Sequence, residues 1–154
     1  MKYSANYRKY RILYAAFALI PLLLGCAFYY FFRNRELLFY AWAGAADLPD
    51  FQRLDTGHLP AFLTWITGSL PDGLWALSGM MLLRCVLWDN KKLCRVYLPV
   101  FCFFAFFYEF LQISENINGT FDPGDLCFMV FAVVFEIFLA RKCGFLTRAV
   151  SGSR

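Results

Sequence analysis

Residues 12–32 read ILYAAFALIPLLLGCAFYYFF, an apolar run of 21 residues without a charged side chain. A helix needs about 20 apolar residues, at about 1.5 Å each, to cross a hydrocarbon core about 30 Å thick. Three further runs, at 72–88, 96–113 and 125–140, come close to that length. We therefore expect four transmembrane helices, and the last three should each take in a turn from their flanks.

The composition of the whole chain also indicates a membrane protein. Of its 154 residues, 60% are hydrophobic and 17% are charged, and the mean hydropathy is +0.51. Soluble domains contain about 45–50% apolar and about 25% charged residues. The apolar runs are unbroken, whereas the strands of an outer-membrane barrel alternate between apolar and polar residues. The sequence therefore predicts a single all-α domain, residues 1–154, folded as a four-helix transmembrane bundle.

The segment between the first two runs, residues 33–71, is more than a polar loop. It contains two apolar stretches, at about 37–46 and 59–69, which are too short to cross a membrane. Each can lie along the interface or enter the membrane and return, as a re-entrant element does. Because Pro71 follows the second stretch, we expect a short helix, a break at 69–73, and then the second transmembrane helix.

The basic residues predict the orientation of the chain. Cytoplasmic loops of membrane proteins carry an excess of Lys and Arg. Eleven of the 15 basic residues lie in the two terminal tails and in the loop between the second and third runs. We therefore expect both termini to lie in the cytoplasm. Since topology explains these basic residues, they give no support to nucleic-acid binding.

Two charged residues lie inside the predicted helices, near their cytoplasmic ends. Arg84 and Glu136 each lie four residues before the end of a run, and these two helices cross the membrane in the same direction. A charge at that depth is costly and usually has a partner, so we predict a buried Arg84–Glu136 ion pair. The alternative is that Arg84 extends to the inner headgroups while Glu136 is protonated or faces another protein.

Polar residues gather where the third run ends and the fourth begins. Glu109 and Gln112 are three residues apart, so they share a helix face. A loop of about ten residues then leads to Asp122 and Asp125 at the start of the fourth run. We expect these four side chains to converge at the outer membrane boundary, together with Asp72 from the start of the second run, and to form a binding pocket.

Three kinds of role are open to these residues. Clustered carboxylates could share a proton, in which case an intramembrane enzyme would use Glu109 and Asp125 as general acid and base. Their oxygens could instead hold a divalent cation or a lipid headgroup. The third role is structural, because acids at a helix start cap it and oppose its dipole.

Several enzyme classes lack their sequence signatures in this chain. His58 is the only histidine, so a paired-histidine zinc motif cannot form, and no CxxC pair is present. The sequence contains neither a G-x-S-x-G nucleophile elbow nor a P-loop. We therefore predict no catalytic residue, no metal site and no cofactor.

Residues 109–126 resemble the VanZ-like family of small bacterial membrane proteins. In this resemblance an acid-x-x-Gln pair, Glu109 and Gln112, ends one span, and Asp-x-x-Asp, Asp122 and Asp125, opens the next. The resemblance implies a multi-pass protein of the bacterial inner membrane with a cell-envelope role, and members are linked to tolerance of glycopeptide antibiotics. We thus expect an outward-facing polar pocket that engages membrane lipids or a lipid-linked envelope precursor. The alternative is a non-catalytic subunit that packs against a membrane-protein partner in a larger complex.

Overall fold

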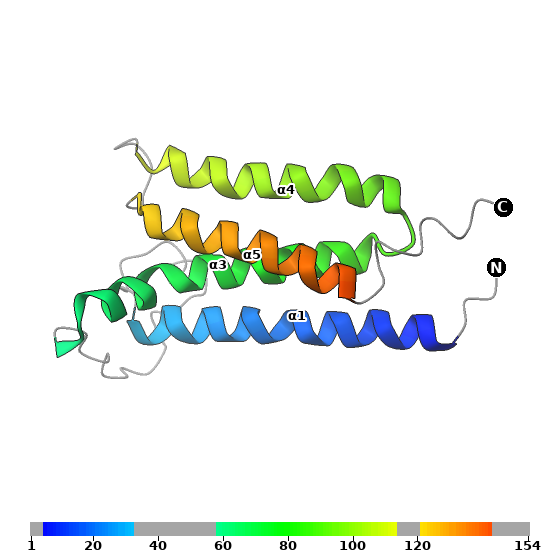
Figure 1. The fold of residues 1–154 in the computed structure, drawn as a ribbon, viewed down its shortest axis with the longest axis horizontal. Coiled ribbons are helices and arrows are strands. Elements are labelled where there is room, and N and C mark those ends of the chain that lie inside the picture. Colours follow the sequence, from blue (N-terminus) through cyan, green and yellow to red (C-terminus); the bar gives the residue numbers. More distant parts are fainter. Residues whose placement is uncertain (1–4, 33–57, 114–120, 143–154) are drawn as a thin grey trace, which may run out of the picture.

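The structure is a computed structural model that describes residues 5–32, 58–113 and 121–142. These residues form four helices, which are α1 (Ala5–Phe32), α3 (Ala61–Val86), α4 (Lys91–Leu111) and α5 (Pro123–Lys142). The helices lie side by side in a bundle (Figure 1). The predicted all-α, four-helix bundle is confirmed.

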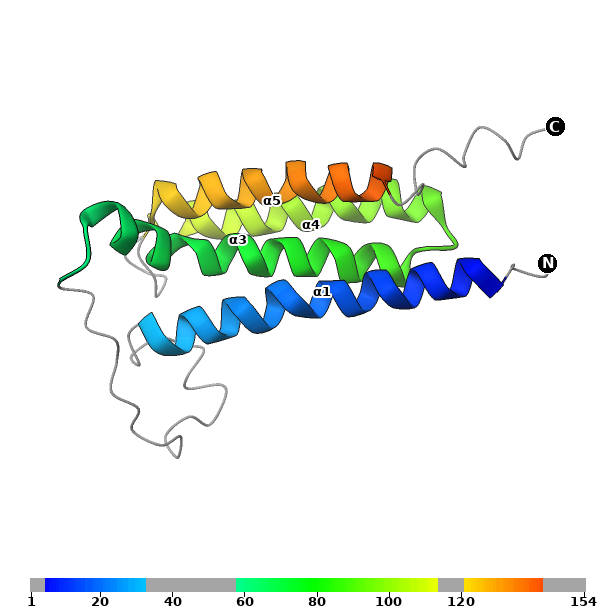
Figure 2. The same ribbon diagram turned by 60° about the horizontal axis from the view of Figure 1, so that its bottom comes forward.

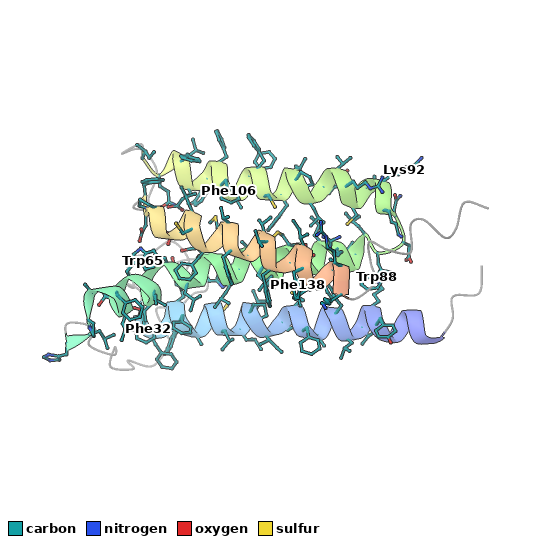
Figure 3. The ribbon with its side chains drawn as sticks, in the orientation of Figure 1. Phe32, Trp65, Trp88, Lys92, Phe106 and Phe138 are labelled. Carbon is teal, nitrogen blue, oxygen red and sulfur yellow. The ribbon has the colours of Figure 1, made fainter. Side chains whose placement is uncertain are left out.

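Three of the helices are long and apolar enough to cross a membrane, namely Tyr10–Phe32 of α1, Lys91–Leu111 of α4 and Pro123–Lys142 of α5. Many large apolar side chains on them point away from the bundle, as the sticks in Figure 3 show. A surface of this kind is stable in contact with lipid acyl chains but not with water, so this is a membrane protein. The orientation of its termini stays a prediction.

The central helix, α3, is covered largely by other parts of the protein. It packs most extensively against α1 on one side and α5 on another, and the hydroxyl of Ser78 donates to the backbone carbonyl of Ala18 on α1 at 2.8 Å. Its polar residues are tolerated because protein rather than lipid covers them. With 26 residues, α3 is as long as a span requires, and its crossing at 72–88 stays a prediction.

The predicted break at 69–73 is wrong, because α3 is continuous from Ala61 to Val86 and contains Pro71. The predicted short helix at 59–69 therefore forms the first turns of α3. An internal proline removes one backbone hydrogen bond and bends a helix without ending it when neighbours pack around it. Figure 2 shows these first turns bent away from the rest of α3. The other predicted short helix, at 37–46, lies outside the described residues.

Glycines allow α3 and α5 to approach each other closely. A Cβ added to Gly73 on α3 would lie 2.9 Å from the backbone carbonyl of Phe128 on α5. On α5, a Cβ added to Gly124 would clash with the hydroxyl oxygen of Ser69. Small residues of this kind bring helix backbones together in membranes. The first halves of α3 and α5 are thereby held together, and this contact sets the position of the polar residues described next.

A pair of glycine substitutions in α3 tests this close approach. Gly73→Ala should destabilise the protein by about 1–3 kcal/mol, because the new methyl group meets backbone atoms of α5. Gly68→Ala is the matched control, since a Cβ added there meets nothing within 4 Å. Thermal unfolding of the purified protein in detergent measures both variants. An equal change in their melting temperatures would contradict the close packing of α3 on α5.

Candidate functional site

The predicted outer polar cluster forms where α4 ends and α5 begins. Glu109 is 2% exposed, and its carboxylate accepts two hydrogen bonds. One comes from the side-chain amide of Gln112 at 2.9 Å, and the other from the backbone N–H of Asp122 at 3.1 Å. The structure therefore brings these three predicted residues together and ties the end of α4 to the start of α5.

Asp122 caps α5 and links it to α3. Its Oδ1 accepts from the backbone N–H of Gly124 at 2.8 Å, and its Oδ2 accepts from the hydroxyl of Ser69 at 3.1 Å. A carboxylate here satisfies helix N–H groups and opposes the helix dipole. Sequence reasoning missed Ser69, because its partner becomes visible only once α3 is known to pack on α5.

Asp125 and Asp72 occupy the same end of the bundle. The backbone N–H of Asp125 donates to the carbonyl of Asp122 at 3.0 Å, and its side chain is 3% exposed. Asp72 is half-buried on α3, three residues after Ser69 and so on the same side of that helix. Within the described residues, no three His, Cys, Asp or Glu side chains are grouped so that they could hold a metal ion.

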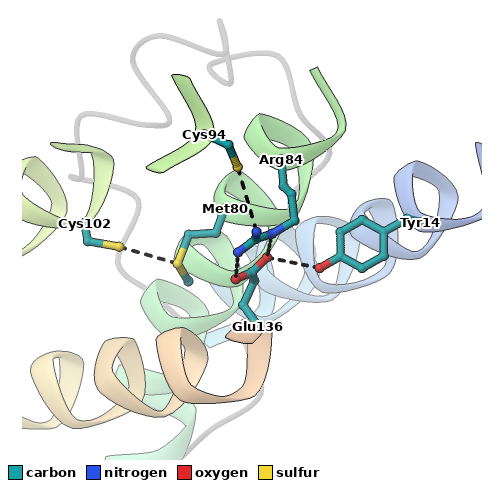
Figure 4. Close-up of polar contacts among 6 residues, drawn as sticks. All are labelled: Tyr14, Met80, Arg84, Cys94, Cys102 and Glu136. Carbon is teal, nitrogen blue, oxygen red and sulfur yellow. Dashed lines mark hydrogen bonds and ion pairs between the residues drawn. The ribbon is translucent and has the colours of Figure 1, made fainter. Parts of the chain in front are cut away.

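The predicted ion pair lies toward the opposite end of the bundle. The guanidinium of Arg84 on α3 forms a bidentate ion pair with the carboxylate of Glu136 on α5 (Figure 4). Arg84 Nη2 donates to Glu136 Oε2 at 2.7 Å. Arg84 is 5% exposed and Glu136 is 1% exposed, so both charged groups are buried inside the bundle.

The other two helices contribute to the same group. The hydroxyl of Tyr14 on α1 donates to Glu136 Oε1 at 3.1 Å, and the thiol sulfur of Cys94 on α4 lies 3.8 Å from Arg84 Nη1. Each of the four helices therefore supplies one side chain to this point (Figure 4). Sequence reasoning missed Tyr14, because it lies in a run that contains many other aromatic and aliphatic residues.

A cavity of about 490 Å³ lies beside the ion pair, between α3, α4 and α5. Its walls are mainly apolar, and Met80 and Cys102, whose sulfur atoms are 3.5 Å apart, belong to them. Lys91 and Arg95 line the cavity from the first turns of α4. No sequence pattern predicted this cavity, because it depends on how far α4 stands from α5.

Comparison of the chain with protein-family models, with curated proteins and with solved structures found no match. Nothing in these comparisons bears on the resemblance of residues 109–126 to the VanZ-like family. The function of the protein has to be inferred from the chemistry of its own residues.

A double-mutant cycle tests the buried ion pair. Glu136→Gln leaves the charge of Arg84 buried without its carboxylate, and Arg84→Met leaves the carboxylate alone. Each change should cost about 3–5 kcal/mol of stability. The double variant should cost less than the sum of the two, by about 0.5–3 kcal/mol. Melting temperature in detergent is the measurement.

The exposed Arg11–Asp89 pair, 2.9 Å apart, provides the control for this cycle. Its removal should change stability by about 0–1 kcal/mol, because solvent screens an exposed pair. If the costs of Arg84→Met and Glu136→Gln simply add in the double variant, the two side chains do not depend on each other.

Proposed function

We propose that this protein is a VanZ-like protein of the bacterial inner membrane that binds, without chemical turnover, the headgroup of an envelope lipid or lipid-linked precursor at its outer polar cluster. The observation that carries the proposal is the joining of Glu109, Gln112 and Asp122 by hydrogen bonds. These are three of the four residues on which the family resemblance rests. A role in tolerance of glycopeptide antibiotics is part of the proposal.

The chemistry of the cluster favours a ligand that donates hydrogen bonds. An ionised carboxylate is an acceptor only, with about four acceptor positions on its two oxygens. Asp122 is half-buried and uses two of these positions for Gly124 and Ser69. Asp72, which is also half-buried at this end, adds a second acid. Headgroups that carry ammonium, hydroxyl or amide groups suit such a surface, whereas a bare phosphate does not.

The same geometry favours binding over catalysis. A general acid or base must come within hydrogen-bond reach of the atom that it protonates or deprotonates. Both oxygens of Glu109 are already occupied by hydrogen bonds from the protein, and the side chain is buried. Asp125 is buried in the first turn of α5. Glu109 therefore acts as a fixed acceptor that holds Gln112 and the start of α5 in place.

A second candidate is a non-catalytic subunit of a larger membrane complex. It is favoured by the aromatic face of α4, on which Phe103, Phe104 and Phe107 are exposed. The rings of Phe103 and Phe107 stack with their centres 5.6 Å apart. Such a preformed aromatic surface can pack against another transmembrane helix as well as against acyl chains.

Neutralisation of Asp122 tests the headgroup proposal. Asp122→Asn keeps an oxygen that can cap α5 but removes the charge, so a donor headgroup should bind about tenfold to a hundredfold more weakly, as expected for loss of a charge-assisted hydrogen bond. Native mass spectrometry of the detergent-purified protein measures the retained lipid. Sensitivity of the cells to a glycopeptide should change in parallel.

Asp89→Asn is the control for this test, because Asp89 is an exposed acid that pairs with Arg11 outside the cluster. It should leave both lipid retention and sensitivity unchanged. Equal retention by Asp122→Asn and the parent, at equal protein levels, would refute headgroup binding. A retained protein partner in place of a lipid would favour the subunit candidate.

A further inference from the structure

The cavity beside the ion pair is separate from the outer cluster and has the size of a ligand site. Small-molecule pockets in proteins have volumes of about 300–1,000 Å³, and this cavity measures about 490 Å³. Leu98 on α4 and Val133 and Ile137 on α5 supply much of its apolar lining. An apolar space between helices that face lipid suits an acyl chain.

The charged groups at this cavity do not balance one another. Arg84 and Glu136 cancel, because they form a bidentate pair. Lys91 and Arg95 remain, four residues apart and therefore on one face of α4. Among the described residues, no carboxylate forms an ion pair with either of them. The cavity thus carries an excess positive charge along one side.

The position of these bases on α4 strengthens the case for an anion. The first turn of a helix carries a partial positive charge, which acids stabilise and bases do not. The first turn of α4 contains no acid and begins with Lys91 and Lys92. Topology explains why bases occur at this end of the bundle, but not why Lys91 and Arg95 line a cavity while Lys92 points away from the bundle (Figure 3). A phosphate group would compensate both the side chains and the helix end.

We infer that this cavity binds one anionic phospholipid, with its phosphate at Lys91 and Arg95 and an acyl chain along the apolar walls between α4 and α5. The lipid belongs to the leaflet at the end of the bundle where α3 is followed by α4, which is the cytoplasmic leaflet in the predicted orientation. This site differs from the outer cluster in place and in chemistry, since it takes a phosphate rather than a hydrogen-bond donor. A lipid held there fills space that α4 and α5 leave open and binds them together.

The test uses the full chain, purified in mild detergent and titrated with phosphatidylglycerol, with native mass spectrometry as the readout. One variant combines Lys91→Gln with Arg95→Gln. Its matched control combines Lys92→Gln with Arg141→Gln, which removes the same charge from exposed positions outside the cavity lining. The cavity variant should bind the lipid about tenfold to thirtyfold more weakly, because each base near an anionic headgroup contributes severalfold. The control should stay within about twofold of the parent.

Two further arms separate the phospholipid from other sources of charge. Phosphatidylcholine, which is zwitterionic, should bind the parent more weakly than phosphatidylglycerol, and glycerol phosphate should fail to displace the bound lipid because it lacks an acyl chain. Val133→Trp, which fills the cavity and leaves Lys91 and Arg95 intact, should also reduce retention. Because Lys91 and Arg95 lie at the cavity edge, their variant tests the site even if Val133→Trp does not fold.

Equal weakening by the two charge variants would overturn the proposal, since it would mean that general surface charge holds the lipid. Complete displacement by glycerol phosphate would overturn it as well, because the site would then be one for free phosphate. Unchanged retention in folded Val133→Trp would show that no acyl chain enters the cavity.

Discussion

A buried charge pair in an otherwise apolar bundle is the constraint on which this fold depends. Neither Arg84 nor Glu136 could face acyl chains without a partner, because a charge at that depth costs several kcal/mol. Their bidentate contact fixes the depth of α3 against α5, and Tyr14 brings α1 to the same point. Cys94 adds α4. An interaction of this kind sets register as well as stability, since sliding α3 against α5 by one turn would leave both charges unpaired.

The pair also accounts for the central position of α3 in the bundle. α3 carries Arg84, Asp72 and the buried Ser69 and Ser78, and such residues need protein around them. α1, α4 and α5 are the helices that are apolar enough to meet lipid directly, and α3 lies between α1 and α5 with extensive contacts to both. The central position of α3 therefore lets protein cover its buried polar residues.

Much of this arrangement could be predicted from the sequence, and the failures have physical causes. Apolar runs predict helices because the membrane requires their length, and equal distances from the helix ends predicted that Arg84 and Glu136 would meet. The spacing of Glu109 and Gln112 predicted a shared face, where they now form a hydrogen bond. The break predicted at Pro71 was wrong, because the packing around a proline decides whether a helix bends or ends there.

The sequence did not predict three features, the roles of Ser69 and Tyr14 and the cavity, for a different reason. Each depends on the distance between two helices, which residues such as Gly73 control through close contact and which no single-helix pattern encodes. Where glycines bring α3 and α5 together, the hydroxyl of Ser69 reaches the carboxylate of Asp122. Where α4 stands further from α5, the space beside Arg84 stays open. Helix separation thus decides where side chains of α3 and α5 form hydrogen bonds and where a cavity remains.

The two ends therefore present opposite chemistry to the membrane. At the outer cluster, acids accept hydrogen bonds and leave Asp122 able to accept more, so this end suits a donor. At the cavity, Lys91 and Arg95 line one side of an apolar space, so this end suits an anion that carries an acyl chain. The buried Arg84–Glu136 pair lies inside the bundle and joins α3 to α5.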